Sequence, residues 1–304
     1  MDFVSYKTIH IYKIRCAIVT GANRGLGLEV CRQLAITGVT VVLTARDEQK
    51  GLEALKKLKE SAGNENINVI FHRLDVADPS TIPPLVDFVL AKFGKLDILV
   101  NNAGVVTSKV DWESLKDYIL KPEWSKLKLS EENYENAEEC LQVNYYGMKR
   151  MVEAFVPLLQ RSNSPRIVNV SSLAGKLQNL PNEWAKGVLN DATNLSEERI
   201  EEVLNKFLKD FKEGTWEANG WPTTLTSYIL TKATLNAYTR VVAKKFPTIL
   251  VNCVCPGCVK TNINDNTGTL TVEEGAESFV RLALLPDDGS TGTFYCRAEV
   301  SSFE

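Results

Sequence analysis

The sequence has little histidine, no long apolar run and almost no excess charge. Only two histidines, His10 and His72, occur among its 304 residues. A zinc site at Cys253, Cys255 and Cys258 would need a fourth ligand, and neither histidine is near these cysteines in sequence. We therefore expect no metal site and interpret these cysteines as reduced, small core residues.

Other absences narrow the class of protein. No apolar run reaches the roughly 18 residues that a membrane-spanning helix needs, which argues against a membrane partner. The net charge of -3 argues against a nucleic-acid partner, which requires a basic surface. Residues 1–13 have neither the apolar centre of a signal peptide nor the Arg/Ser-rich character of a transit peptide. We expect a cytoplasmic protein.

Short β-branched segments alternate with helical patterns along the chain. Most are apolar without alternating polar residues, which is typical of a parallel sheet that helices cover on both faces. Strand–helix alternation favours right-handed βαβ units. We predict an α/β fold, a doubly wound seven-stranded parallel sheet (Rossmann-like), in a single domain over residues 1–304. The strands are expected at residues 15–20, 39–43, 69–74, 96–100, 166–170, 249–254 and 293–296.

Two long stretches interrupt this rhythm, at residues 105–140 and 173–222. Stretches of this length inside a compact domain usually form lids or carry their own elements. The second predicts a helix, because Ser196 suits an N-cap and Gly214 can end it. One face of that helix would be apolar, with Ile200, Val203, Leu204, Phe207, Leu208 and Phe211. We predict a helical insert at about residues 173–222 that lies over the functional site.

A glycine-rich loop, Thr20-Gly21-Ala22-Asn23-Arg24-Gly25-Leu26-Gly27, follows the first strand and opens a helix. Glycines at such a turn let the backbone approach a pyrophosphate, and the helix N-terminus offers free N–H groups. The spacing is a variant of G-x-G-x-x-G, so the glycines alone are weak support. The strand before and the helix after them favour a dinucleotide site.

The residues at the end of the second strand indicate whether the cofactor is NAD or NADP. A site for NAD has an acid there to bind the ribose 2′-hydroxyl, whereas this chain has Ala45 followed by Arg46. A guanidinium suits a 2′-phosphate by charge and geometry, and Arg24 in the glycine loop supplies a second cation. Asp47 opposes this interpretation, but the two cations and the missing acid favour NADPH/NADP⁺.

Tyr228 and Lys232 lie four residues apart in a segment, residues 224–246, that reads as a helix. They therefore share a face of that helix. A phenol titrates near pH 10 and needs help to exchange a proton at neutral pH. We expect the ammonium of Lys232 to lower the pKa of Tyr228. A tyrosine and a lysine at this spacing often occur together by chance. Other motifs are therefore needed to interpret the pair as catalytic.

Small and polar residues follow three of the expected strands. Ser171-Ser172 ends one strand, Asn101-Asn102-Ala103-Gly104 ends another, and Pro256-Gly257 ends a third, with Thr261 soon after. The carboxyl ends of strands are where open α/β sheets bind ligands. Packing alone does not account for such residues at several strand ends, so we expect them to form one site with Tyr228.

With these motifs together, the chain resembles the short-chain dehydrogenases/reductases over nearly its whole length. The resemblance implies that Tyr228 is the general acid, that Ser172 hydrogen-bonds the substrate oxygen, that Lys232 tunes Tyr228 and binds the nicotinamide ribose, and that Asn144 holds a water in a proton relay. Cofactor contacts are implied for Gly21, Asn23, Arg24, Gly25, Leu26, Gly27, Arg46, Asp75, Val76, Asn102, Ala103, Gly104, Tyr228, Lys232, Pro256, Gly257, Val259 and Thr261.

The interval of 56 residues between Ser172 and Tyr228 is far longer than in typical members. In this it resembles a carbonyl-reductase-like plant branch that includes salutaridine reductase and the menthone and neomenthol reductases. That branch implies a monomer, because the inserted helices cover the face that other members use to oligomerise. Some branch members reduce a carbon–carbon double bond and have an acid in place of the tyrosine. Tyr228 therefore favours carbonyl reduction.

An apolar pocket with one polar focus fits a hydrophobic ketone. We predict NADPH-dependent reduction of a cyclic, menthone-like terpenoid ketone. The alternatives are an alkaloid ketone reductase and a cofactor-binding sensor without turnover, against which the intact set of catalytic residues argues. Candidate pocket residues are Trp112, Tyr118, Trp124, Leu173, Leu177, Trp184 and Trp221.

Overall fold

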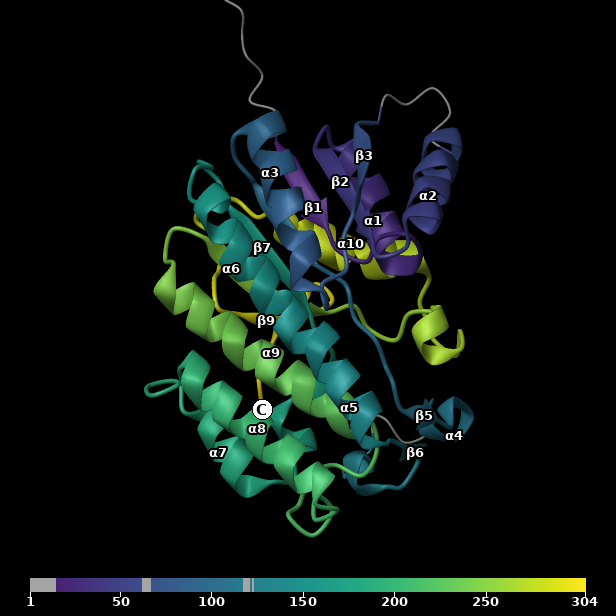
Figure 1. Ribbon diagram of the computed structural model, residues 1–304, viewed down its shortest axis with the longest axis vertical. Helices are drawn as coiled ribbons and strands as arrows, with labels where there is room; N and C mark the ends of the chain where they lie inside the picture. The colour runs from purple at the N-terminus through teal and green to yellow at the C-terminus, as the bar shows by residue number, and fades with distance from the viewer. Residues whose placement is uncertain (1–14, 62–66, 117–120, 122) are drawn as a thin grey trace, which may run out of the picture.

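A sheet with helices on both faces forms the centre of the computed structural model, which describes residues 15–61, 67–116, 121 and 123–304 (Figure 1). The strand order is β10-β9-β8-β7-β4-β1-β2-β3, and all neighbours are parallel except β9 and β10. This confirms the predicted α/β fold. The strands are β1 (Cys16–Val19), β2 (Thr40–Ala45), β3 (Val69–Arg73), β4 (Ile98–Asn101), β7 (Arg166–Val170), β8 (Leu250–Cys255), β9 (Phe294–Cys296) and β10 (Glu299–Ser301).

The sheet has eight strands in the described part of the chain, one more than the sequence predicted. The additional strand, β10, is antiparallel and pairs with β9 through a two-residue connection. The first residue of that connection, Arg297, has a φ of 55°. Hairpin turns of this kind are usually marked by Gly, Asn or Asp. Because arginine stands there instead, the sequence carries no hairpin signal and β10 was not predicted.

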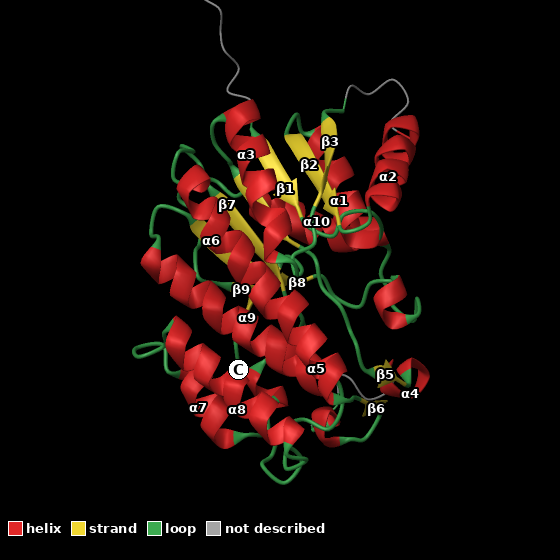
Figure 2. Ribbon diagram, in the orientation of Figure 1, coloured by secondary structure: helices red, strands yellow, loops and turns green. Residues whose placement is uncertain are grey.

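Two layers of helices bury the two faces of the sheet (Figure 2). Adjacent strand residues point to opposite layers: Cys16 and Ile18 pack with α3, α6 and α9, whereas Ala17 and Val19 pack with α1 and α10. This explains why the strands are apolar without alternation. The helices are α1 (Gly25–Ile36), α2 (Glu48–Ser61), α3 (Ile82–Phe93), α4 (Trp112–Lys116), α5 (Tyr134–Leu141), α6 (Met148–Leu159), α7 (Glu183–Asn190), α8 (Glu197–Lys212), α9 (Thr226–Lys245) and α10 (Val272–Ala283).

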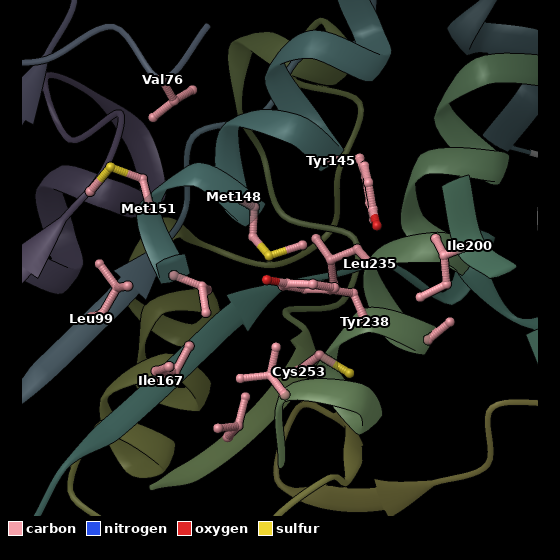
Figure 3. Packing of buried hydrophobic residues seen from close by; sticks show 14 of the residues in the cluster. Val76, Leu99, Tyr145, Met148, Met151, Ile167, Ile200, Leu235, Tyr238 and Cys253 are labelled. Carbon is pink, nitrogen blue, oxygen red and sulfur yellow. The ribbon is translucent and has the colours of Figure 1, made fainter. Parts of the chain in front are cut away.

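The predicted insert helix is α8. Its N-cap is Ser196, whose side chain accepts a hydrogen bond from Arg199 N, and Gly214 follows its end with a φ of 70°. The apolar face of α8 is buried in the same cluster as the sheet residues. Figure 3 shows Tyr145 and Tyr238 between the sheet and Ile200 of α8.

Ion pairs fix the position of α8 on its neighbours. Lys149 of α6 lies 3.4 Å from Glu197 and 2.7 Å from Glu201, and Lys245 of α9 lies 2.9 Å from Glu197. The start of α8 is therefore held to both α6 and α9, and Figure 1 shows α8 next to α9. The apolar face of α8 thus belongs to the main core, which gives the predicted position of the insert over the functional site no support from α8.

A smaller element follows Gly104. Strands β5 (Lys109–Val110) and β6 (Ser130–Glu131) form a separate antiparallel pair, with α4 and a single turn at Trp124–Lys126 between them. Among the described residues of this segment, 105–116, 121 and 123–133, Leu129 and Trp124 share an apolar cluster with Leu225 and Tyr228 at the start of α9. We call these described residues the lid segment. Among the described residues, no helix is long and apolar enough to cross a membrane.

Candidate active site

The expected site residues gather at the carboxyl edge of the sheet. Strand β1 lies between β2 and β4, so the chain order reverses between β1 and β4. In open α/β sheets the ligand crevice forms outside such a reversal. The glycine loop follows β1 there, and Asn102 to Gly104 follow β4, so two of the predicted motifs meet at this point.

The glycine loop is open on one side and tightly packed on the other. Gly21 has a φ of 62°, and a Cβ added to Gly27 would lie 2.5 Å from Asn102 Nδ2 and 2.8 Å from Gly21 O. Helix α1 begins with no side-chain hydrogen bond at its N-cap, Arg24. Its first amides therefore remain available to an anion. This cradle of backbone N–H groups fits the phosphates of a dinucleotide.

Asn102 supports the loop. Its side-chain amide donates to Thr20 O at 2.8 Å and to Gly21 O at 3.1 Å. The hydroxyl of Thr20 in turn accepts from the backbone N of Asn102 at 3.0 Å and from that of Ala103 at 2.9 Å. The two motifs hold each other in place. Asn102 therefore supports the glycine loop, and its side-chain amide is occupied by hydrogen bonds within the protein.

The two predicted cations, Arg24 and Arg46, are exposed beside the loop and at the end of β2. Asp47, which opposed the NADPH interpretation, accepts a hydrogen bond from Lys50 N at 3.0 Å. That backbone hydrogen bond is the main cause that lowers the pKa of Asp47. The carboxylate thus serves the start of α2, and Arg46 remains the charged residue that follows β2.

The residues after β3 divide into one polar and one apolar member. Asp75 is half-buried and accepts a hydrogen bond from Ala77 N at 3.0 Å. Val76 is buried against Gly147, where an added Cβ would lie 2.7 Å from Val76 Cγ2. Asp75 is therefore the member of this pair that remains half-exposed at the sheet edge.

After β8, the chain passes close to the glycine loop and to α10. A Cβ added to Gly275 of α10 would lie 2.6 Å from Val259 Cγ2 and 2.8 Å from Leu26 Cδ2. Leu26 and Val259 thus pack on α10 and hold the two loops together. Thr261 Cγ2 lies 3.8 Å from a Cβ added to Gly25, so Thr261 borders the open side of the cradle. Pro256 is buried and Gly257 has a φ of 87°.

Tyr228 and Lys232 occupy the first two turns of α9. Lys232 Nζ lies 5.5 Å from the centroid of the Tyr228 ring and donates to Val170 O at 2.8 Å. The Ser172 hydroxyl accepts from Ala174 N at 3.1 Å, and the Ser172 side chain is near enough to the phenol of Tyr228 to lower its pKa in part. The neighbouring Ser171 is buried and donates to Asn236 Oδ1 at 2.6 Å. The fold therefore brings Ser172, and not Ser171, to Tyr228.

Asn144 lies in a single π-helical turn, Gln142–Gly147, between α5 and α6. π-Helical turns are rare and frequently mark functional sites. The side chain of Asn144 is 1% exposed. It accepts from Val105 N at 2.8 Å and donates to Val105 O at 2.9 Å. The side chain of Asn144 thus holds the backbone of Val105 through both ends of its amide.

Comparison with known proteins identifies the family. Residues 15–183 match the family model described as short chain dehydrogenase. The chain belongs to the short-chain dehydrogenase/reductase family. A (+)-neomenthol dehydrogenase of Arabidopsis thaliana is 55% identical over 290 residues, which cover 95% of this chain and 98% of that protein.

Two solved structures of plant reductases are similar. Salutaridine reductase from Papaver somniferum has a TM-score of 0.84 and 52% identity, covering 92% of this chain and 99% of that chain. Menthone neomenthol reductase from Mentha piperita has a TM-score of 0.84 and 45% identity, covering 94% of this chain and 99% of that chain. The resemblance to the plant branch is thus confirmed. The chain is an oxidoreductase of alcohol and ketone groups that uses a nicotinamide cofactor.

Burial is the main cause of the pKa shifts of Tyr228 and Lys232. It raises the pKa of Tyr228, and the hydrogen bond from Ser172 only partly offsets the increase. Burial also lowers the pKa of Lys232 to about 8. The expected lowering of the Tyr228 pKa by Lys232 is therefore wrong for the protein alone, because the loss of hydration dominates and Lys232 is not among the groups that lower this pKa.

An apolar cluster surrounds Tyr228 on the side of the lid segment. Its residues come from that segment, from the turn after Ser172 and from the start of α9: Val106, Val110, Leu115, Trp112, Trp124, Leu129, Ala174, Leu225 and Ile229. Helices α7 and α8 contribute no described residue to this cluster. The lid segment, and not the helices of the insert, supplies most of the apolar surface next to the phenol.

The pocket candidates that the sequence suggested fall into different places: the Tyr228 cluster, the main core and the surface. Trp112 and Trp124 belong to the Tyr228 cluster. Trp221 belongs to the main core, where its indole N–H donates to Asp210 Oδ2 at 2.9 Å. Trp184 is 38% exposed. Of the remaining candidates, Leu173 and Leu177 pack on the main core and Tyr118 lies outside the described residues.

The sequence missed one charged residue beside the site. Glu132 has its two carboxylate oxygens directed at Ser227, the residue before Tyr228, and at Thr107. Burial raises the pKa of Glu132. A single glutamate in a polar stretch carries no periodic or spacing signal, so only the fold reveals its position. Among the described residues, no group of three or more His, Cys, Asp or Glu side chains could hold a metal ion.

Proposed function

We propose that this chain is an NADPH-dependent reductase of hydrophobic cyclic ketones, with menthone-like terpenoids as its substrate class. The observation that carries the proposal is the phenol of Tyr228, whose pKa responds to the nearby Ser172 side chain and which belongs to the apolar cluster of the lid segment. An apolar wall around one hydrogen-bonding centre suits a ketone with few other polar groups. The names of the neomenthol and menthone relatives support the same class.

The residues of the chain would deliver the proton. When bound, the nicotinamide supplies the hydride to the carbonyl carbon, and the cofactor carries that chemistry. Tyr228 donates its phenolic proton to the carbonyl oxygen, so that C=O becomes CH–OH. Ser172 hydrogen-bonds the same oxygen and aligns it. The raised pKa of Tyr228 keeps the phenol protonated at neutral pH, which is the form a proton donor requires.

Lys232 and Asn144 would complete the proton path. Lys232 is 4% exposed, and its Nζ is close to the Tyr228 ring. Its N–H groups can bind the nicotinamide ribose. Asn144 ties the strand-end backbone at Val105 to the helix that carries it. In this proposal, a water on the main chain of Asn144 returns a proton from solvent towards Tyr228.

The cofactor would be NADPH because of the charges around the adenosine end. Arg46 follows β2 directly and is exposed, and Arg24 is exposed at the start of α1. Both can reach a 2′-phosphate without losing a buried partner. Ala45 leaves no carboxylate at the position that would select a free 2′-hydroxyl.

An alkaloid ketone is the second candidate, which the similarity to salutaridine reductase favours. A cationic amine would be recognised by a carboxylate in the pocket. Among the described residues, the apolar cluster around Tyr228 contains no acidic member, and both oxygens of the nearby Glu132 accept hydrogen bonds from Ser227. These contacts favour a neutral ketone.

The test is consumption of NADPH by the purified full chain with menthone, related cyclic ketones and a morphinan-type ketone. We expect turnover of the neutral cyclic ketones. Tyr228→Phe should lower turnover about 10²- to 10⁴-fold, because the proton donor is lost, while NADPH binding stays. A near-normal rate for this variant would refute the role of Tyr228. Tight NADPH binding without turnover of any ketone would favour the sensor alternative.

We also propose that the protein is a monomer. Helix α8 occupies the outer side of α6 and α9 and is held there by Lys149 and Lys245. A second copy could not pack on these two helices while α8 covers them. Cytoplasmic location remains a prediction from the sequence.

A further inference from the structure

The start of the catalytic helix α9 is tied to the lid segment by a series of buried hydrogen bonds. They join residues 125–132 to residues 223–227, and we call these two segments together the entry clasp. The bonds run from Thr223 N and Thr224 N to Ser125 O (2.8 and 3.2 Å), from the Thr224 hydroxyl to Leu127 O, from Leu129 N to Thr224 Oγ1 (3.0 Å) and from Leu225 N to Ser130 Oγ (2.8 Å).

The clasp holds a backbone conformation that the helix itself does not favour. Leu225, the N-cap of α9, has φ 51° and ψ 40°, in the left-handed region that residues other than glycine rarely adopt. Its side chain offers no hydrogen-bond acceptor to the first turn. The free amides at the start of α9 therefore need acceptors from another part of the chain.

Glu132 supplies such an acceptor. Its Oε2 accepts from Ser227 N at 3.1 Å, and its Oε1 accepts from the Ser227 hydroxyl. The Thr107 hydroxyl, near the other end of the lid segment, donates to Asn136 O at 2.8 Å and lies 3.4 Å from the same Oε1. One carboxylate of the lid segment thus accepts both hydrogen bonds from the residue that precedes Tyr228. A negative charge at a helix N-terminus is also favourable.

The packing continues from Ser227 to the second catalytic element. Burial raises the pKa of the Cys140 thiol to about 11, and the Ser227 side chain is among the groups that oppose this increase. Asn144 Nδ2 donates to Cys140 Sγ at 3.2 Å, and neither Ser227 nor Cys140 has exposed surface. Ser227, Cys140 and Asn144 are therefore buried polar neighbours behind the start of α9.

We infer that Glu132 is a positioning residue for proton transfer: it caps the catalytic helix from the lid segment and fixes the turn that carries Tyr228. The inference rests on the proposed function, because it assigns Glu132 a part in placing the proton donor of that reaction. Glu132 does not contact the reacting atoms in this arrangement; it acts through Ser227.

Glu132→Ala tests the inference with a neighbouring control. We expect kcat to fall about 10- to 100-fold, because a displacement of about 1 Å at a reacting group costs up to about 10²-fold in rate. The KM and the Kd for NADPH should stay within about twofold, because the glycine loop lies on other elements. Glu131→Ala, which changes the exposed glutamate next to it in sequence, should match the wild type.

Rescue by the amide separates positioning from a general loss of structure. Glu132→Gln should recover most of the kcat, because the amide oxygen can still accept from Ser227 N while the Ser227 and Thr107 hydroxyls rotate to accept from the NH₂ group. Ser227→Ala, which removes only the hydroxyl contact, should lower kcat several-fold. Wild-type kcat in both Glu132→Ala and Ser227→Ala would overturn the inference.

Hydrogen exchange provides a readout that does not depend on turnover. In the cofactor-free protein, Glu132→Ala should increase amide exchange in residues 223–232, and Glu131→Ala should leave it unchanged. If the wild type reduces no ketone, the proposed function fails while this exchange result still decides whether Glu132 holds the turn. Unchanged exchange in Glu132→Ala would overturn the inference. If that variant does not fold, the same two readouts on Ser227→Ala decide.

Discussion

At the scale of single residues, the site depends on removing two titratable groups from water. Tyr228 and Lys232 lie one helical turn apart, and burial moves their pKa values in opposite directions, up for the phenol and down to about 8 for the ammonium. Both shifts favour the neutral form. The protein alone therefore holds a protonated phenol beside a lysine that can gain or lose its proton near neutral pH.

The specificity for the cofactor belongs to this scale as well. Arg46→Ala should raise the Kd for NADPH about tenfold, which corresponds to about 1.4 kcal/mol, because a charge-assisted contact with the 2′-phosphate is lost. The Kd for NADH should change little. Fluorescence titration of both cofactors checks this, with Lys50→Ala as a control for loss of an exposed cation nearby. Equal losses for the two cofactors would show that Arg46 does not bind the 2′-phosphate.

At the scale of elements, the first turn of α1 and the loop before it require glycine for a reason of space. Gly27→Ala should destabilise the protein by about 1–3 kcal/mol, because the new Cβ would meet the backbone of Gly21 and Ala22 at under 3.0 Å. It should also weaken NADPH binding. Urea unfolding and cofactor titration are the measurements.

Gly187 offers a matched control in another helix. It lies in α7, is exposed and has no atom within 4 Å of an added Cβ. Gly187→Ala should therefore stabilise the protein by about 0.5–1 kcal/mol, as expected for alanine in place of glycine within a helix. Destabilisation by both alanines would show that the close packing of Gly27 is not what requires a glycine there.

The sequence predicts those elements whose signals are local. The seven parallel strands, the N-cap of α8 at Ser196 and the helix that carries Tyr228 all follow from periodicity and capping. The hairpin to β10 does not, because Arg297 stands where a turn glycine would be expected. Glu132 could not be found either, since its role arises from contacts with Ser227 and Thr107 that lie far away in sequence.

At the scale of the whole molecule, the two insertions have different positions. The stretch after Ser172 forms α7 and α8, and its apolar face completes the main core beside α6 and α9. The lid segment after Gly104 instead surrounds Tyr228. The predicted position of the insert over the functional site is therefore not supported by the packing of its helices.

The position of α8 leads to a prediction for the assembly. Light scattering coupled to size exclusion should give one species with the chain mass of 33.8 kDa across a concentration series, with and without NADPH. The physical reason is that the outer side of α6 and α9 is already occupied. A mass that doubles with concentration would contradict the proposed monomer and would require an interface elsewhere on the surface.

The entry clasp has a consequence for recombination between relatives. Residues 125–132 and residues 223–227 share one set of buried hydrogen bonds, although almost a third of the chain separates them. In a chimera that takes the lid segment from another family member, the hydrogen-bond donors and acceptors stay matched only if both segments of the entry clasp come from the same parent. We therefore expect that a change of substrate range by recombination requires the two segments to be exchanged together.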